Sequence, residues 1–92
     1  MISSFKCKDT QELYETGVNL RFASIARVAL RKLDMLAAAT IVETLRVPPG
    51  NRLEQLRGNR AGQWSVRIND QWRVCFSWSG TGAENVEIVD YH

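Results

Sequence analysis

The sequence predicts a single α+β domain over residues 1–92, in which two N-terminal helices pack on one face of a mostly antiparallel sheet of four to five strands. Its length and its 45% hydrophobic content suit one hydrophobic core. In the first half, hydrophobic residues recur with the spacing of helices, whereas after Gly50 they alternate with the period of two that is typical of strands. Pro48 and Pro49 separate the two halves, because proline ends helical structure.

The N-terminal elements are predicted from an apolar run and from residues that begin and end helices. Residues 2–5 are short and apolar, and we expect them to form a first strand. Asp9 or Thr10 can cap a following helix, which runs through Thr16. Gly17 is expected to end this helix, because glycine readily adopts the left-handed conformation found after a helix end.

A second and longer helix is predicted over residues 22–39. Its apolar residues follow the i, i+3, i+4, i+7 spacing of one buried face, and its charged residues fall mostly outside that face. Residues 40–45 can add one more turn before the prolines.

Two strands joined by a tight turn are predicted in the second half. Residues 64–68 and residues 72–78 each alternate between apolar and polar side chains. A two-residue loop between them would mix the two faces, whereas a three-residue loop at residues 69–71 pairs Val66 with Val74. The three-residue loop is favoured, because it leaves all the apolar side chains on one face.

This register places Arg67 directly opposite Arg73 on the other face of the sheet, where like charges are destabilising. Three explanations are open: both side chains extend into water, Asp90 or Glu54 compensates them, or the pair binds a polyanion. We favour the polyanion. The face is then expected to carry four polar side chains in the open: Ser65, Arg67, Arg73 and Ser77.

A turn and a final strand complete the predicted fold. Residues 80–82 are rich in glycine and predict the turn, and residues 86–91 predict the strand. Residues 53–57 can form a further strand whose faces the sequence does not assign. The expected order is therefore one strand, two helices and then four strands.

Charge is unevenly distributed along the chain, although the net charge is only +2. Residues 46–73 carry six arginines and no lysine and have a net charge of +4, whereas residues 74–92 have a net charge of −3. Guanidinium groups suit bidentate phosphate contacts and stack on bases. The arginine-rich segment therefore favours a phosphate-bearing partner such as a nucleic acid.

The cysteines and the hydropathy indicate a cytoplasmic protein. Cys7 and Cys75 are far apart, have no metal-ligand spacing around them and are expected to remain reduced thiols. No signal peptide precedes the first apolar residues, and no apolar run approaches the length of a membrane span. We therefore expect no membrane partner.

The last three residues combine a carboxylate, a phenol and an imidazole. They are Asp90, Tyr91 and His92, and His92 is the only histidine in the chain. Histidine is the side chain that most readily exchanges a proton near neutral pH. This end of the chain is either a solvated tail or part of an acid–base site, and the arginine-rich segment upstream favours the site.

Four segments resemble the HigB branch of the RelE-type bacterial toxins, most closely the HigB/GraT group. They are residues 2–5 (ISSF), 50–58 (GNRLEQLRG), 62–74 (GQWSVRINDQWRV) and 86–92 (VEIVDYH). The resemblance covers nearly the whole chain. It implies a RelE-like fold and the toxin of a type II toxin–antitoxin system, which enters the 30S A site of the ribosome and cuts the mRNA there. It also implies a cognate helix-turn-helix antitoxin, with operator DNA contacted only through the antitoxin complex.

The resemblance also implies roles for individual residues. It places Arg73 on the scissile phosphate and Asp90, Tyr91 and His92 in a C-terminal catalytic cluster. Glu54 departs from the best-described HigB proteins, which have histidine there, but it fits the YoeB branch, in which a glutamate in a similar setting is the proposed general base. Whether Glu54 or the Tyr91/His92 pair is the base stays open. Four further arginines of the charged segment are the expected RNA-binding residues: Arg52, Arg57, Arg60 and Arg67.

These residue types also supply the chemistry that RNA cleavage needs without a metal. The reaction needs a base on the 2′-hydroxyl, a cation on the phosphate and an acid for the 5′-oxygen. Glu54, Arg73 and His92 provide one of each. We therefore expect an endoribonuclease with no metal and no cofactor.

Two other functions remain as alternatives. The related ParE toxins share the fold class but inhibit DNA gyrase by protein contact, and a plain nucleic-acid-binding domain would bind without cutting. Neither has a chemical need for Glu54, Arg73 and His92 together, so the nuclease is the favoured function.

Overall fold

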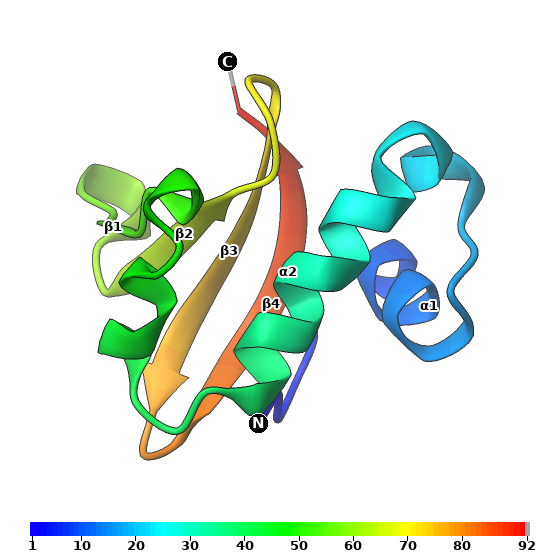
Figure 1. Cartoon of the computed structure of the whole chain (residues 1–92). Helices are drawn as coiled ribbons and strands as arrows, with labels where there is room; N and C mark the ends of the chain where they lie inside the picture. The colour runs from blue at the N-terminus through cyan, green and yellow to red at the C-terminus, as the bar shows by residue number, and fades with distance from the viewer. Residues whose placement is uncertain (92) are drawn as a thin grey trace.

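The computed structural model describes residues 1–91 and has the predicted α+β architecture (Figure 1). Over these residues, two α-helices pack on one face of an antiparallel sheet with the strand order β1-β2-β3-β4. The helices are α1 (Lys8–Thr16) and α2 (Ala26–Ala38), and the strands are β1 (Glu54–Gln55), β2 (Gln63–Arg67), β3 (Trp72–Ser79) and β4 (Gly82–Asp90). Short 3₁₀ segments lie between them: η1 (Leu20–Ile25), η2 (Val42–Arg46), η3 (Pro49–Asn51) and η4 (Gly58–Arg60).

The predicted first strand is reduced to two isolated parallel bridges along the edge of β4. Ile2 pairs with Ala83 and Phe5 pairs with Val86. Backbone hydrogen bonds support these bridges, including one of 2.8 Å from the Ser3 N–H to the Ala83 carbonyl. The N-terminal segment thus lies along β4 without forming a regular strand.

The start of α1 differs from the prediction, whereas its end agrees with it. The helix begins at Lys8 after Cys7, which makes no side-chain capping bond, so the predicted cap at Asp9 or Thr10 is wrong. Thr10 lies inside the helix and is fully buried, and its hydroxyl accepts a hydrogen bond of 3.0 Å from the Ile88 N–H of β4. Gly17 ends the helix with a φ of +80°.

The predicted long helix is divided into η1 and α2. Asn19 begins η1 by accepting a hydrogen bond of 3.0 Å from the Arg21 N–H, while its amide donates to Asp9 and Glu12. Phe22 leaves helical geometry, with a φ of −109° and a ψ of 16°, and packs edge-on against Trp72 at 5.6 Å between ring centroids. The predicted extra turn near residues 40–45 is present as η2.

The register between β2 and β3 confirms the three-residue loop. Val66 pairs with Val74, and Arg67 pairs with Arg73. Asn69 shapes the turn, because its side-chain oxygen accepts hydrogen bonds of 2.8 Å from the backbone N–H groups of Gln71 and Trp72. β1 is shorter than the predicted strand at residues 53–57, and β4 begins four residues earlier than the predicted strand at residues 86–91.

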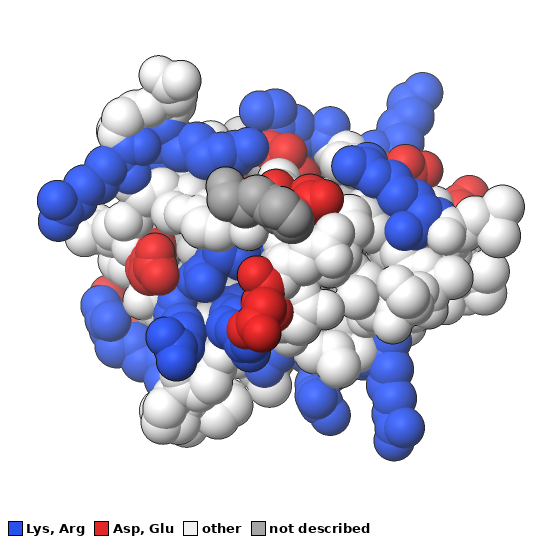
Figure 2. All heavy atoms as spheres, turned by 90° about the horizontal axis from the view of Figure 1, so that it is seen from above, with Lys and Arg blue, Asp and Glu red and all other residues white. Residues whose placement is uncertain are grey.

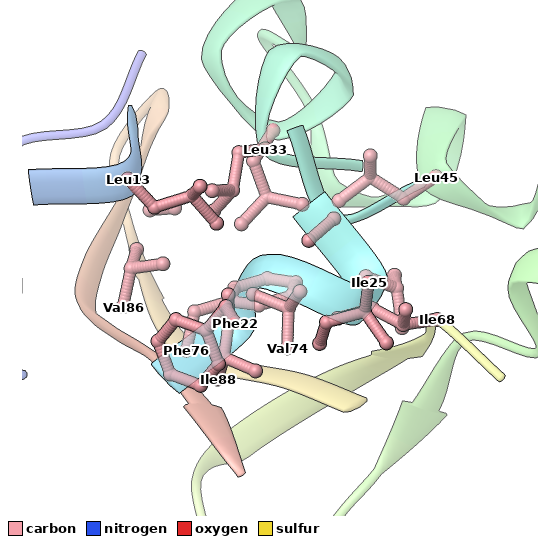
Figure 3. Close-up of a cluster of buried hydrophobic side chains, with 14 of the residues drawn as sticks. Leu13, Phe22, Ile25, Leu33, Leu45, Ile68, Val74, Phe76, Val86 and Ile88 are labelled. Atoms are coloured by element: carbon pink, nitrogen blue, oxygen red, sulfur yellow. The ribbon is translucent and has the colours of Figure 1, made fainter. Parts of the chain in front are cut away.

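The hydrophobic core lies between the helices and the inner face of the sheet (Figure 3). Leu13 of α1 and Leu33 of α2 are fully buried with Val74 and Phe76 of β3 and Val86 of β4. Burial of a side chain of this size stabilises the fold by about 1.5–3 kcal/mol relative to leaving it exposed. Because side chains alternate along a strand, this core directs Arg73 and Cys75 to the outer face of β3.

The outer face of the sheet is more covered than predicted. Ser65 is fully buried and Arg73 is 6% exposed, so the expectation that both lie in the open is wrong, and Ser77 and Arg67 are half-buried. The segment around β1 contributes to this cover, because its Arg52 carbonyl and its Glu54 carboxylate both lie close to the Arg73 guanidinium. Glu54 pairs with Ser65, and the carbonyl of Arg52 accepts a hydrogen bond from Arg73.

No helix within residues 1–91 combines the length and the apolar character needed to cross a membrane.

Candidate active site

Arg73 is the most firmly held charged group on the outer face of the sheet. Its Nε–H donates to the Ser65 hydroxyl at 2.8 Å, and one of its terminal nitrogens, Nη2, donates to the Arg52 carbonyl at 2.7 Å. Nη2 also lies 3.8 Å from the Glu54 carboxylate. The other terminal nitrogen, Nη1, makes no hydrogen bond to residues 1–91, so its hydrogens remain for a group outside them.

Glu54 is brought to Arg73 by the pairing of β1 with β2. Glu54 lies opposite Ser65, which itself lies opposite Cys75, so the carboxylate and the guanidinium meet over the outer face. The Glu54 side chain is 51% exposed, whereas that of Arg73 is 8% exposed. The site therefore pairs an accessible carboxylate with a buried guanidinium that hydrogen bonds hold in place.

The end of β4 lies beside the turn between β2 and β3 (Figure 1). The Tyr91 N–H donates to the Gln71 carbonyl, and the Gln71 side-chain amide donates to Asp90 at 3.1 Å. These contacts place the Tyr91 ring over Arg73, with 5.4 Å between the guanidinium carbon and the ring centroid. His92 lies outside the described residues.

A hollow of about 870 Å³ opens beside these groups. Its lining includes Glu54, Arg57 and Tyr91, together with Gln55, Leu56 and Gly62. The hollow is thus bordered by a carboxylate, by an aromatic ring and by the Arg57 guanidinium, which forms no ion pair with residues 1–91. These groups can contact a base and a phosphate. Within residues 1–91, no three Asp, Glu, Cys or His side chains lie together as potential ligands of a metal ion.

The four predicted RNA-binding arginines are of two kinds. Arg60 lies 3.6 Å from Glu87 and donates to Gln63 at 3.1 Å, and Arg67 forms an ion pair with Asp70. By contrast, Arg52 and Arg57 are exposed and form no ion pair with residues 1–91. Figure 2 shows basic side chains over both halves of the face that it presents, with acidic side chains between them.

The opposed pair of Arg67 and Arg73 is confirmed, and carboxylates of the protein itself lie beside both members. Asp70 pairs with Arg67, and Glu54 lies beside Arg73. The predicted compensation of this arginine pair by Glu54 is therefore present. Asp70 compensates Arg67 as well, and it was not predicted to do so.

Two residues of the site were not predicted to belong to it. Ser65 holds Arg73, and its place on the same face as Arg73 in the predicted register was the signal that could have found it. Gln71 holds both Asp90 and Tyr91 through a contact between the turn and the chain end, and no pattern in the sequence indicates that contact.

The comparisons with known proteins place the chain among the small toxins of the RelE-like class. A solved structure of YoeB in complex with YefM from Staphylococcus aureus has the same fold, with a TM-score of 0.58, 17% identity, and 100% of this chain and 98% of that chain covered. The model of the family described as the RelE-like toxin of type II toxin–antitoxin system HigB matches residues 3–92.

Curated relatives agree with this family. The chain is 42% identical over 80 residues to Toxin HigB-1 of Vibrio cholerae, covering 85% of this chain and 84% of that protein. It is 32% identical over 94 residues to Endoribonuclease HigB of Proteus vulgaris, covering 100% of both. The chain belongs to the HigB-like family of toxins.

Proposed function

We propose that this protein is an endoribonuclease toxin that cuts mRNA in the ribosomal A site without a metal ion. The observation that carries the proposal is the guanidinium of Arg73, which is fixed by Ser65 and Arg52 and lies 3.8 Å from the accessible Glu54 carboxylate. Glu54 in turn lines the hollow beside it. The relative named Endoribonuclease HigB supports the activity.

In the proposed reaction, Glu54 accepts the proton of the 2′-hydroxyl of the RNA. The 2′-oxygen then forms a bond to phosphorus as the bond from phosphorus to the 5′-oxygen breaks, which leaves a 2′,3′-cyclic phosphate. Nη1 of Arg73 donates to the phosphate oxygens as negative charge develops on them. The C-terminal cluster of Asp90, Tyr91 and His92 supplies the acid that protonates the 5′-oxygen.

The substrate is held mainly by cations that form no ion pair with residues 1–91. Arg52 and Arg57 flank the proposed reaction centre and are available for phosphates of the RNA backbone. Arg67 can exchange the exposed Asp70 for a phosphate at little cost, because exposed ion pairs are worth about 1 kcal/mol or less. Arg60 contributes less, since it is engaged by Glu87.

The proposed partners are the ribosome with its mRNA and a cognate helix-turn-helix antitoxin. The family description places the chain in a type II toxin–antitoxin system, and the structural neighbour YoeB was solved in complex with YefM. Contact with operator DNA is proposed only through the antitoxin complex. We propose a cytoplasmic location, since both partners of the reaction are there.

The decisive experiment adds purified protein to ribosomes that carry a defined mRNA. We expect one discrete cut at the A-site codon with a 2′,3′-cyclic or 3′-phosphate end, no cut with the Arg73→Ala variant, and unchanged supercoiling by DNA gyrase. Intact mRNA together with inhibited gyrase would replace this proposal with a ParE-like function. Intact mRNA, active gyrase and retained RNA binding would indicate a plain RNA-binding domain.

A further inference from the structure

A second polar centre lies in the interior, on the helix side of the loop that carries Arg52. Lys32 of α2 is 8% exposed, and Asn51 of η3 is fully buried. The Lys32 ammonium donates to the side-chain oxygen of Asn51 at 2.6 Å. Lys32 forms no ion pair with residues 1–91, so this amide oxygen is its closest compensating group there.

Lys32 is an exception among the buried positions of its helix. The other buried residues of α2 are Ala29, Leu33 and Leu36, which belong to the hydrophobic core. Burial lowers the pKa of the Lys32 amine below its ordinary value of 10.5, and the neighbouring charges of Arg31 and Arg67 lower it further. A buried amine is unfavourable unless a hydrogen bond compensates it, so the contact with Asn51 is essential to this packing.

Asn51 is held on both sides of its amide group. Its oxygen accepts from Lys32, and its nitrogen donates to the Leu45 carbonyl at 3.0 Å and lies 3.4 Å from the Val47 carbonyl. Asn51 therefore joins α2 to the end of η2 and fixes the backbone at the end of η3.

The residue after Asn51 has an unusual backbone conformation. Arg52 has a φ of 46° and a ψ of 55°, in the left-handed region that residues other than glycine rarely adopt. Such a conformation persists only where neighbouring structure fixes it. The carbonyl of Arg52 is the one that accepts the 2.7 Å hydrogen bond from Nη2 of Arg73.

We propose that Lys32 and Asn51 form a positioning pair, which holds Arg52 in its left-handed conformation so that the Arg52 carbonyl orients the Arg73 guanidinium. This inference rests on the proposed function for its consequence in catalysis, but the positioning itself is a property of the free protein. Neither Lys32 nor Asn51 lines the hollow, so the pair acts through Arg52 and not on the RNA.

The test compares two variants that remove the pair. Lys32→Met leaves the amide oxygen of Asn51 without its donor. The double variant Lys32→Met/Asn51→Leu replaces both partners by apolar groups of similar size, so neither partner is left facing an empty position. This variant also removes the donor of the Leu45 carbonyl. Lys8→Met is the matched control, because Lys8 is exposed and forms no ion pair with residues 1–91.

The first readout is the NMR signal of the Arg73 Nε–H in the free protein. In the wild type and in Lys8→Met, we expect a resolved and slowly exchanging signal, since this hydrogen is donated to buried Ser65. In the variants that remove the pair, the signal should shift and exchange faster. An unchanged Arg73 signal in a folded double variant would overturn the proposal.

The second readout is mRNA cleavage on ribosomes. Without the pair, kcat should fall roughly 10- to 100-fold, the range expected for a misplaced catalytic group, while KM stays nearly constant. Arg52→Gly separates the carbonyl from the side chain: glycine adopts the left-handed conformation unaided, so the Arg73 signal should persist while KM rises. Altered Arg73 signals without cleavage by any protein, wild type included, would refute the proposed function and leave the positioning role supported.

Discussion

Arg67 and Arg73 face each other across β2 and β3, yet their surroundings suit them to different tasks. Arg67 is half-buried and pairs with an aspartate in the adjoining turn, so its guanidinium can leave that partner and bind a phosphate. Arg73 is held by Ser65 and by the Arg52 carbonyl. A cation with a fixed position can stabilise the charge that develops in a transition state without first reorganising, and this favours Arg73 for catalysis.

Arg73→Ala is therefore expected to slow a single-turnover cut by roughly 100-fold or more while largely preserving ribosome affinity. Arg73→Lys should rescue little of this loss, because one ammonium cannot reproduce the separate contacts of Nε and Nη2 together with the proposed contact of Nη1 with the phosphate. Arg67→Ala is the control: its affinity should fall in a salt-dependent way, and its saturated cutting rate should stay near that of the wild type. Equal losses of saturated rate in both alanine variants would contradict this division.

Glu54→Gln tests which group takes the proton of the 2′-hydroxyl. The amide keeps the size of the side chain but cannot act as the base, so the saturated rate should fall and the acidic limb of the pH–rate profile should flatten. Tyr91→Phe is the paired variant, since it retains the ring over Arg73 and removes only the hydroxyl. A wild-type rate in Glu54→Gln together with a slow Tyr91→Phe would assign the base to the phenol.

The elements of the fold were predicted well where apolar and polar residues alternate along a strand, or where one glycine ends a helix. The β2–β3 register follows from keeping Val66 and Val74 on the core side, and Gly17 ends α1 as expected. The predicted long helix was wrong at its start, because the side-chain bonds of Asn19 and the burial of Phe22 depend on tertiary neighbours. The contacts of Gln71 with the chain end escaped prediction for the same reason.

The turn between β2 and β3 holds the end of the described chain through Gln71, and Gln71→Ala tests this role. Loss of the side-chain amide removes the bond to Asp90, while the Gln71 carbonyl still accepts from Tyr91. We expect kcat to fall roughly 10-fold at nearly constant KM, since the cluster is displaced but still present. Gln11→Ala is the matched control, because the Gln11 side-chain amide donates to Glu15 on the exposed side of α1, away from the chain end. A wild-type kcat in Gln71→Ala would show that the hydrogen bond from Gln71 to Asp90 does not contribute to catalysis.

On the scale of the whole molecule, ion pairs connect parts of the chain that are distant in sequence. Glu87 of β4 lies 3.5 Å from the Lys6 ammonium of the N-terminal segment and 3.6 Å from Arg60 of η4. Cys75 of β3 lies directly opposite Glu87 and is fully buried on this outer face. The acidic last strand thus contacts basic residues from two other parts of the chain, Lys6 and Arg60.

The buried thiol of Cys75 makes the stability of the molecule depend on pH. Burial raises the thiol pKa above its ordinary value of 9.0. Between 9.0 and the raised value, the unfolded chain has lost this proton while the folded chain keeps it, so the free energy of unfolding contributed by Cys75 must fall as pH rises. The lowered pKa of Lys32 has the opposite effect at pH values below 10.5. There the folded chain loses the Lys32 proton before the unfolded chain does, so this contribution to the free energy of unfolding rises with pH.

Urea unfolding of the wild type and of Cys75→Ala, measured from pH 7 to above pH 10, separates these contributions. The difference in free energy of unfolding between the two proteins should be constant below 9.0 and should shift in favour of Cys75→Ala above it, since that variant has no buried thiol to keep protonated. Cys7→Ala is the control and should follow the wild-type decline, because Cys75 is intact. A difference between the wild type and Cys75→Ala that stays constant across the whole range would show that the folded chain releases this proton as easily as the unfolded one.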